Sequence, residues 1–102
     1  MNNKITVLIA DDNSDFSATL AGYVKAEDDL ELIGMARDGI EAYDMIKNAE
    51  PDIVLLDVIM PRLDGLGVLE KINESNINKM PMCIMLSAVG QDKITQKAIN
   101  LG

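Results

Sequence analysis

The chain has 102 residues, which is enough for one domain, and 48% of them are hydrophobic and 25% charged, an ordinary globular composition. The formal net charge of −8 argues against nucleic acid as a partner of this chain alone, because such binding needs a basic face. No histidine is present, which excludes imidazole bases and histidine-based metal sites. A single cysteine provides no disulfide framework, so a reducing cytoplasm is the expected compartment.

Apolar runs alternate with amphipathic runs from the start of the chain. Residues 5–10 form a short apolar run that predicts a buried strand, and it is followed by Asp11, Asp12 and Asn13. Ser14 is expected to cap a helix. The apolar face of that helix is predicted from the spacing of Phe16, Leu20 and Val24.

The same alternation continues through the middle of the chain. Residues 30–36 predict a second strand, followed by a helix that stops before Pro51. Residues 53–56 predict a third buried strand that delivers Asp57 at its end. A loop is expected over residues 61–65, followed by a third helix marked by Leu69 and Ile72.

The last predicted pair consists of a strand over residues 82–86, ending at Ser87, and a helix over residues 94–101. Four strand–helix repeats with continuously apolar strands predict a parallel sheet that is covered by helices on both faces. The expected fold is therefore α/β, a flavodoxin-like doubly wound parallel sheet. Such folds bind ligands at the carboxyl ends of the strands, at the topological switch point.

Three carboxylates are expected to meet at that edge, because Asp11 and Asp12 follow the first strand and Asp57 ends the third. Like charges this close need protonation or a cation. A hard divalent ion with oxygen ligands would relieve this repulsion, and Mg²⁺ is the first candidate. The backbone carbonyl of Ile59 is expected to be a further ligand. Each aspartate alone is as well explained as a turn residue or helix cap. Their convergence favours a site.

A carboxylate held beside a cation can attack phosphorus and form an acyl phosphate, which makes Asp57 the candidate nucleophile. Ser87, at the end of the neighbouring strand, is expected to donate its hydroxyl to a phosphoryl oxygen. A strand-end cap is the alternative role for Ser87. Ile59 and Val89 each lie two residues past a site residue, so both are candidates for excluding water from the acyl phosphate. Simple packing is the alternative role for these two.

Three motifs resemble those of the response-regulator receiver domains, and the resemblance spans the whole chain. They are Ile9-Ala10-Asp11-Asp12-Asn13, then Leu55-Leu56-Asp57-Val58-Ile59-Met60-Pro61 with Asp64-Gly65, and Leu86-Ser87-Ala88. The resemblance implies that Asp57 is the phosphoacceptor, that Asp11 and Asp12 form the acidic metal pocket, and that Ser87 is the switch hydroxyl. It also implies a phosphohistidine donor, which is a phosphotransferase or a histidine kinase. Mn²⁺ and Ca²⁺ are alternative cations.

Two longer stretches, residues 57–68 and 86–95, are similar to the sporulation response regulators of endospore-forming bacteria. That similarity implies a role in sporulation transcription, exerted by a separate DNA-binding domain of the parent protein. Receivers normally continue into a fifth strand that ends with a lysine contacting the phosphoryl group. The sequence stops at Gly102, so it is interpreted as a receiver domain over residues 1–102 that lacks the last strand and helix. The strand over residues 82–86 would then be a sheet edge, open to homodimer formation or exchange of elements.

Three other classes of function were weighed against a signalling phosphoacceptor. An aspartyl phosphatase needs a second carboxylate two residues after the nucleophile, and Ile59 stands there, so an enzyme with turnover is not expected. A flavin carrier would place hydroxyls and amides after the first strand, where Asp11 and Asp12 would repel a phosphate. A phosphorylation-independent interaction module is disfavoured by the intact acidic triad. Cys83 is expected to be a buried small hydrophobe, not a redox centre.

Overall fold

A computed structural model describes residues 4–86 of the protein. Within them, four strands alternate with three helices, and the expected strands are confirmed. The elements are β1 (Ile5–Ala10), α1 (Ser14–Ala26), β2 (Leu30–Ala36), α2 (Gly39–Ala49), β3 (Ile53–Asp57), α3 (Gly65–Glu74) and β4 (Met82–Leu86). The predicted helix at 94–101, together with Ser87 and Val89, lies outside the described residues. No described helix is long and apolar enough to cross a membrane.

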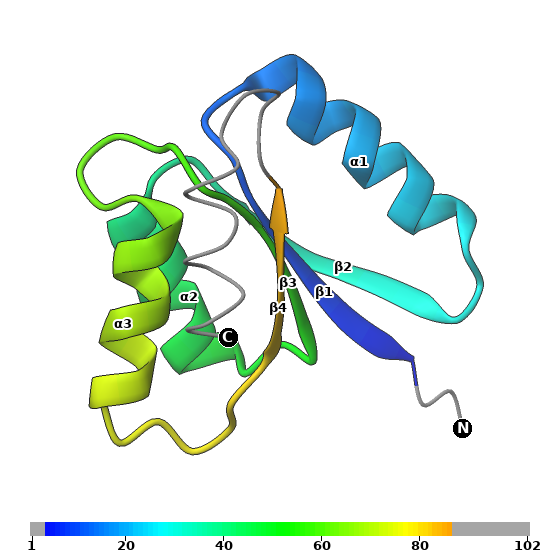
Figure 1. The fold of residues 1–102 in the computed structure, drawn as a ribbon. Helices are drawn as coiled ribbons and strands as arrows, with labels where there is room; N and C mark the ends of the chain where they lie inside the picture. Colours follow the sequence, from blue (N-terminus) through cyan, green and yellow to red (C-terminus); the bar gives the residue numbers. More distant parts are fainter. Residues whose placement is uncertain (1–3, 87–102) are drawn as a thin grey trace.

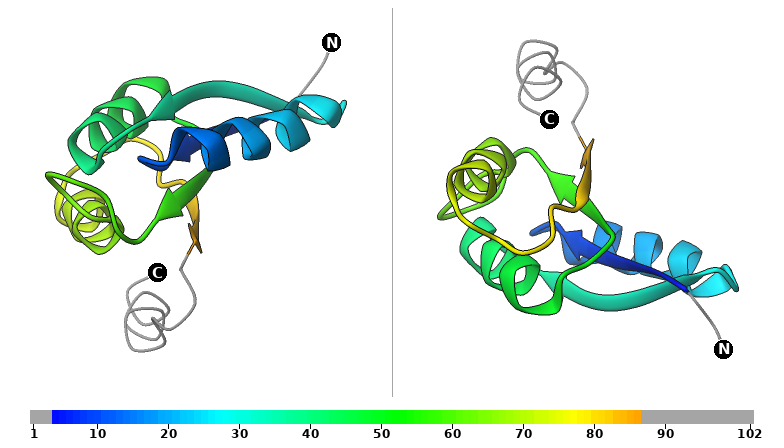
Figure 2. Two further views of the ribbon diagram at one scale, coloured as in Figure 1. Left: turned by 90° about the horizontal axis from the view of Figure 1, so that it is seen from above. Right: turned by 90° about the horizontal axis from the view of Figure 1, so that it is seen from below.

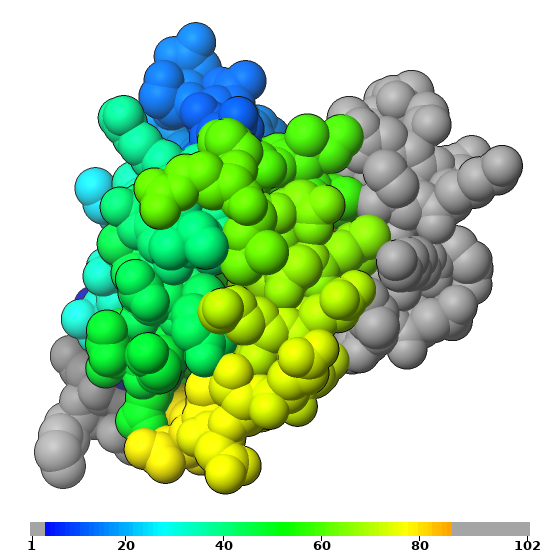
Figure 3. Space-filling view, turned by 90° about the vertical axis from the view of Figure 1, so that its left-hand side faces the viewer, coloured from blue at the N-terminus to red at the C-terminus, as the bar shows by residue number. Residues whose placement is uncertain are grey.

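The strands form one parallel sheet in the order β2-β1-β3-β4. Helix α1 covers one face of this sheet, and α2 and α3 lie together on the other face (Figures 1 and 2). The space-filling view from that second side shows α2 and α3 side by side as a continuous surface (Figure 3). The fold is thus the α/β, doubly wound receiver architecture that the sequence predicts, with the order reversing between β1 and β3.

Strand β1 lacks the alternation of apolar and polar residues that is usual for a strand with one face in solvent. Val7 and Ile9 pack into a cluster with Ala21 and Val24 of α1. Leu8 and Ala10 point to the opposite face, into the larger cluster formed with α2 and α3. Because both faces of the strand are covered, every residue from 7 to 10 is at most 2% exposed.

Two details of α1 differ from the sequence prediction. The N-cap is Asn13, not Ser14, and its side-chain oxygen accepts the backbone N–H of Phe16 at 3.0 Å. The buried positions are Ser17, Ala21 and Val24, while Phe16 is 43% exposed. The helix turns its small residues toward the sheet, and the buried Ser17 hydroxyl donates to the backbone carbonyl of Asp11 at 3.2 Å. The prediction of Phe16 as a core residue was therefore wrong.

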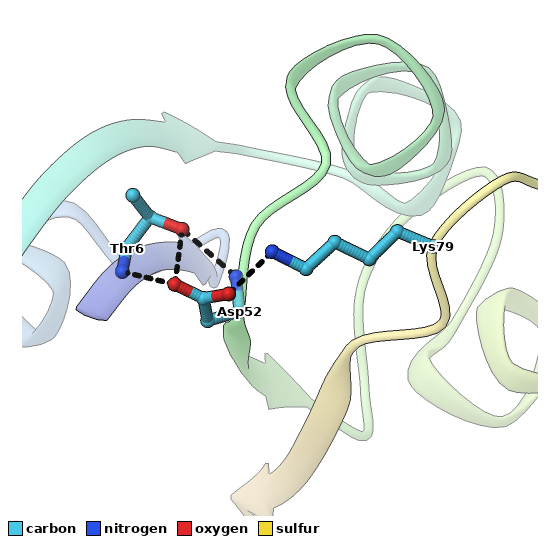
Figure 4. A network of polar contacts seen from close by, with 3 residues as sticks. All are labelled: Thr6, Asp52 and Lys79. Carbon is cyan, nitrogen blue, oxygen red and sulfur yellow. Dashed lines mark hydrogen bonds and ion pairs between the residues drawn. The ribbon is translucent and has the colours of Figure 1, made fainter. Parts of the chain in front are cut away.

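The amino ends of the strands are tied together by a polar network centred on Asp52 (Figure 4). Its Oδ2 accepts the backbone N–H of Thr6 at 2.8 Å and the Thr6 hydroxyl at 3.0 Å. Its Oδ1 pairs with the ammonium group of Lys79, in the segment before β4. These bonds, that to Lys79 above all, lower the pKa of Asp52 to about 2. The network joins β1, β3 and the approach to β4 at the end of the sheet away from the acidic residues.

Strand β4 is one of the two edge strands of the described sheet, with β2 at the other edge, and it is the least buried strand. Met82 is 65% exposed and Ile84 is 43% exposed. Cys83 between them is half-buried, and burial raises the pKa of its thiol to about 11, which agrees with its predicted role as a small hydrophobe. Association of copies through this strand stays a prediction.

Candidate functional site

The parallel register brings the acidic residues together, as expected from the sequence. Strands β1 and β3 are neighbours with Ala10 opposite Leu56. The next residue along each strand is Asp11 or Asp57. Carboxylate oxygens of Asp11, Asp12 and Asp57 all lie within 4.8 Å of one another.

The backbone around Asp11 is held on several sides. Its N–H donates to the carbonyl of Ala36 at 3.0 Å, which joins it to the end of β2. Its Oδ1 accepts the N–H of Asn13 at 2.8 Å, and its carbonyl accepts the Ser17 hydroxyl. The side chain is only 5% exposed, whereas Asp12 is exposed to solvent. Asp11 is therefore a fixed, buried carboxylate beside a freer one.

Asp57 is half-buried, and its environment favours the protonated form. Burial comes first among the causes that raise its pKa to about 6 from the ordinary 3.8, followed by repulsion from Asp11 and, more weakly, from Asp12. Among residues 4–86, the contribution that opposes this rise comes from the N–H of Ile59, which donates to Asp57 Oδ1 at 3.3 Å. The described residues therefore compensate the negative charge of Asp57 poorly.

The loop that follows Asp57 ends at Gly65, whose backbone is bonded to the start of the loop. The N–H of Gly65 donates to the carbonyl of Val58 at 2.8 Å. A Cβ on Gly65 would overlap the carbonyl oxygen of Asp57, so no larger residue fits there without displacing the backbone of Asp57. Asp64 caps α3 by accepting the N–H of Gly67 at 2.8 Å. Asp64 is therefore the last residue of the loop and the N-cap of α3, while Gly65, predicted as a loop residue, is the first residue of the helix.

The donor chemistry of the cluster fits a hard divalent cation. All three side chains present oxygen, and the mutual repulsion of their charges is what such an ion relieves. The backbone carbonyl of Ile59 was predicted as a further ligand. Ile59 comes two residues after Asp57 in the chain and is 52% exposed. A cavity of about 280 Å³ borders Asp11 and Asp12 on the side of α1 and β2. Ser87, the predicted switch hydroxyl, lies outside the described residues.

Sequence reasoning missed two residues that shape this site. Asn13 is the cap that turns the chain from Asp11 and Asp12 into α1, and its type and place after a strand are the usual signs of a cap. Arg62 adopts a left-handed conformation with φ of 71° and pairs with Asp38 at 3.3 Å. Nothing in the sequence predicts that pair, because an arginine at this place is compatible with any exposed loop.

Comparison with known proteins agrees with the motifs and the fold. Residues 7–102 match the family described as response regulator receiver domain. The response regulator domain of CheB from Thermotoga maritima is 30% identical, with a TM-score of 0.85, over 98% of this chain and 74% of that one. The receiver domain of the putative response regulator NarL from Mycobacterium tuberculosis is 27% identical, with a TM-score of 0.87, over 97% of this chain and 78% of that one.

A third similar structure is the CheX–CheY–BeF₃–Mg²⁺ complex from Borrelia burgdorferi, at 33% identity and a TM-score of 0.78, over 96% of this chain and 72% of that one. The family match covers nearly the whole chain, and it agrees with the strand order and the acidic cluster at the carboxyl ends of the strands. The chain therefore belongs to the response regulator receiver domains of two-component systems.

Proposed function

We propose that Asp57 is the phosphoacceptor of this receiver domain and takes a phosphoryl group from a phosphohistidine protein. The observation that carries the proposal is the convergence of Asp57 with Asp11 and Asp12 within 4.8 Å at the switch point of the sheet. Solvated turn residues would not share so small a volume at a cost in charge repulsion. A site that binds a cation and a phosphoryl group explains why the three carboxylates lie together.

The transfer is a substitution at phosphorus. A carboxylate oxygen of Asp57 forms the new O–P bond while the N–P bond of the phosphohistidine breaks, and the imidazole leaves with the electron pair of that bond. Asp57 must be ionised to attack, and its raised pKa of about 6 still leaves most of it ionised at neutral pH. Burial beside Asp11 holds the attacking carboxylate in one place.

Asp11, Asp12, Asp57 and the backbone carbonyl of Ile59 are the proposed ligands of a divalent cation, Mg²⁺ in the first place. When bound, the cation neutralises negative charge on the carboxylates and on the transferring phosphoryl group. The Borrelia relative, whose complex contains Mg²⁺, supports that choice of metal. Mn²⁺ and Ca²⁺ suit the same oxygen ligands.

The domain is proposed to signal and not to turn over substrate, since Ile59 occupies the place where a phosphatase of similar pattern needs a carboxylate. The hydroxyl of Ser87 is proposed to respond to the phosphoryl group. Sporulation transcription is the proposed output, through a DNA-binding domain of the parent protein, and it rests on the similarity of residues 57–68 and 86–95 to sporulation regulators. The cytoplasm is the proposed compartment, and homodimer formation through β4 is proposed as a property of the isolated chain.

Incubation with a small acyl phosphate and Mg²⁺, followed by intact mass measurement, tests the central claim. The wild-type chain should gain the mass of one phosphoryl group, and Asp57→Asn should gain none. Asp28→Asn is a matched control, because Asp28 is exposed in the turn after α1 and should leave the modification unchanged. Equal modification of the Asp57→Asn chain would refute the assignment.

A further inference from the structure

The loop between β3 and α3, residues 58–64, leaves Asp57 and returns against the start of α2. The Arg62 guanidinium pairs with Asp38 Oδ2 at 3.3 Å. Beside this pair, a Cβ on Gly39 would overlap the carbonyl oxygen of Leu63, so the loop backbone lies directly on the first residue of α2. The part of the loop remote from Asp57 is therefore anchored on a helix.

The part of the loop near Asp57 is anchored as well. The N–H of Val58 donates to the carbonyl of Leu86 at 3.2 Å, and the carbonyl of Val58 accepts the N–H of Gly65 at 2.8 Å. The N–H of Ile59 donates to Asp57 Oδ1 at 3.3 Å. The backbone from Ile59 to Pro61 spans these two anchors, so its path, including the Ile59 carbonyl, depends on both.

Asp38 is well placed to act as the fixed partner of the ion pair. Its Oδ1 accepts the N–H of Glu41 at 2.8 Å as the N-cap of α2, and its side chain is only 17% exposed. Arg62 is the freer partner, with a side chain that is 65% exposed. Its φ of 71° lies in a region that glycine and asparagine enter more easily, so a residue with a long side chain needs a compensating contact there. The ion pair with Asp38 supplies one.

We propose that the Asp38–Arg62 ion pair positions the β3–α3 loop for cation binding, by holding the Ile59 carbonyl in line with the three site carboxylates. This inference rests on the proposed cation site and adds two positioning residues, neither of which touches the reacting groups. The proposed role accounts for an arginine in a left-handed conformation at position 62. The charge of Arg62 is opposite in sign to the charges of the three site aspartates and has the same sign as the charge of the cation.

The sign of the effect separates positioning from simple electrostatics. Arg62 is a positive charge on a loop that borders an acidic site, so its removal by Coulomb's law alone would strengthen the binding of a divalent cation. Positioning predicts the reverse, because the loop carrying the Ile59 carbonyl would lose its anchor. Because an ion pair of this exposure contributes little free energy, its loss is expected to change the affinity for Mg²⁺ by about threefold.

Titration calorimetry with Mg²⁺ as the probe, on the full chain at constant ionic strength, tests the inference. Arg62→Gln is expected to weaken Mg²⁺ binding by about threefold, and Arg62→Lys to restore most of the loss. Asp38→Asn should weaken binding to a similar extent while keeping the helix cap, because asparagine caps as well as aspartate. The double variant Asp38→Asn/Arg62→Gln should be no weaker than either single one, since both remove the same contact.

Arg37→Gln is the charge control. Arg37 borders the same cavity as Asp11 and Asp12 and makes no ion pair within residues 4–86. Its loss should leave Mg²⁺ affinity unchanged or raise it. Circular dichroism in EDTA checks that each variant is folded. If Arg62→Gln is not, Asp38→Asn is compared with Asp28→Asn, which removes the same charge at an exposed turn residue, and the positioning role requires the larger loss in Asp38→Asn.

The outcomes distinguish the two proposals. A wild-type chain that binds Mg²⁺ while Arg62→Gln binds it equally well or more tightly overturns the positioning role, even if Asp38→Asn binds it more weakly, because loss of an acidic charge weakens cation binding by Coulomb's law alone. That outcome leaves the proposed function standing. Wild-type chain that binds no Mg²⁺ overturns the cation site itself, and the positioning role with it. Strictly additive losses in the double variant also overturn the inference, because the two residues would then act independently.

Discussion

Replacement of Asp57 by asparagine is expected to stabilise the metal-free fold, although it removes the residue on which the proposed function depends. The carboxylate is half-buried, and its pKa of about 6 reflects burial first and repulsion from Asp11 and Asp12 next. Asparagine has nearly the same shape, carries no charge and can still accept the N–H of Ile59. The substitution therefore relieves the repulsion and leaves the packing in place.

The magnitude follows from the difference between the pKa of about 6 in the folded chain and the ordinary value of 3.8. A difference of that size corresponds to about 3 kcal/mol if nothing screens the charge. Since Asp57 is only half-buried, solvent screening reduces the expected gain to about 1–2 kcal/mol. For a chain of this length that gain raises the Tm by about 4–16 °C.

The pH dependence has a definite sign. A carboxyl group with a raised pKa in the folded state penalises folding most above pH 6, where both states are ionised, and not at all below about pH 3.8, where both are protonated. The advantage of Asp57→Asn should therefore be full at pH 7.5 and shrink as the pH falls from about 6 toward 4. Saturating Mg²⁺ should shrink it too, because the wild-type chain gains more from the ion than a variant that lacks one ligand.

Urea unfolding followed by circular dichroism in EDTA, at pH 7.5 and at pH 4.5, measures these differences. Asp28→Asn controls for the general benefit of removing one acidic charge from a chain of net charge −8, and its effect should stay within about 0.5 kcal/mol. Equal stability of wild type and Asp57→Asn at pH 7.5, or an advantage that grows toward low pH, would refute the electrostatic reasoning.

Two further predictions concern the rim of the site and the opposite end of the sheet. Ile59 is 52% exposed beside Asp57, the proposed phosphoacceptor, so Ile59→Asn should admit water and shorten the acyl phosphate lifetime severalfold, measured by loss of the phosphorylated mass. Ile5→Asn, at a residue 42% exposed at the amino edge, should not. Lys79→Met removes the partner that lowers the pKa of Asp52 to about 2, so it should lower the Tm by a few degrees at pH 7. That loss should fade between about pH 4 and pH 2, as Asp52 becomes protonated in both chains, and a constant difference would contradict it.

The strands and the acidic site could be predicted because their determinants are local. Short, mainly apolar runs bounded by polar or turn residues predict strands, so residues 5–10, 30–36 and 82–86 have the same bounds in the structure as in the prediction. Parallel pairing then places the residues after β1 and β3 side by side, and Asp11 and Asp57 follow from that rule alone.

The parts that could not be predicted depend on contacts between distant segments. Ser17 looks like a surface residue in the sequence, yet it is buried on α1, and its hydroxyl donates to the carbonyl of Asp11. Arg62 and Asp38 are separated by 24 residues and meet only because the β3–α3 loop lies on α2. The spacing of apolar residues contains no information about either contact.

Two aspartates near the ends of β3 show why the acidic cluster is best explained by function. Asp52, just before the strand, is compensated by Thr6 and Lys79, and its pKa falls to about 2, so its charge stabilises the fold. Asp57, at the other end, accepts one N–H from the described part of the chain and has two acidic neighbours, and its pKa rises to about 6. The same side chain on the same strand thus stabilises the fold at one end and destabilises it at the other. Stability alone would favour asparagine at position 57, so the carboxylate has to be accounted for by a ligand or a reaction, and a cation with a phosphoryl group satisfies both conditions.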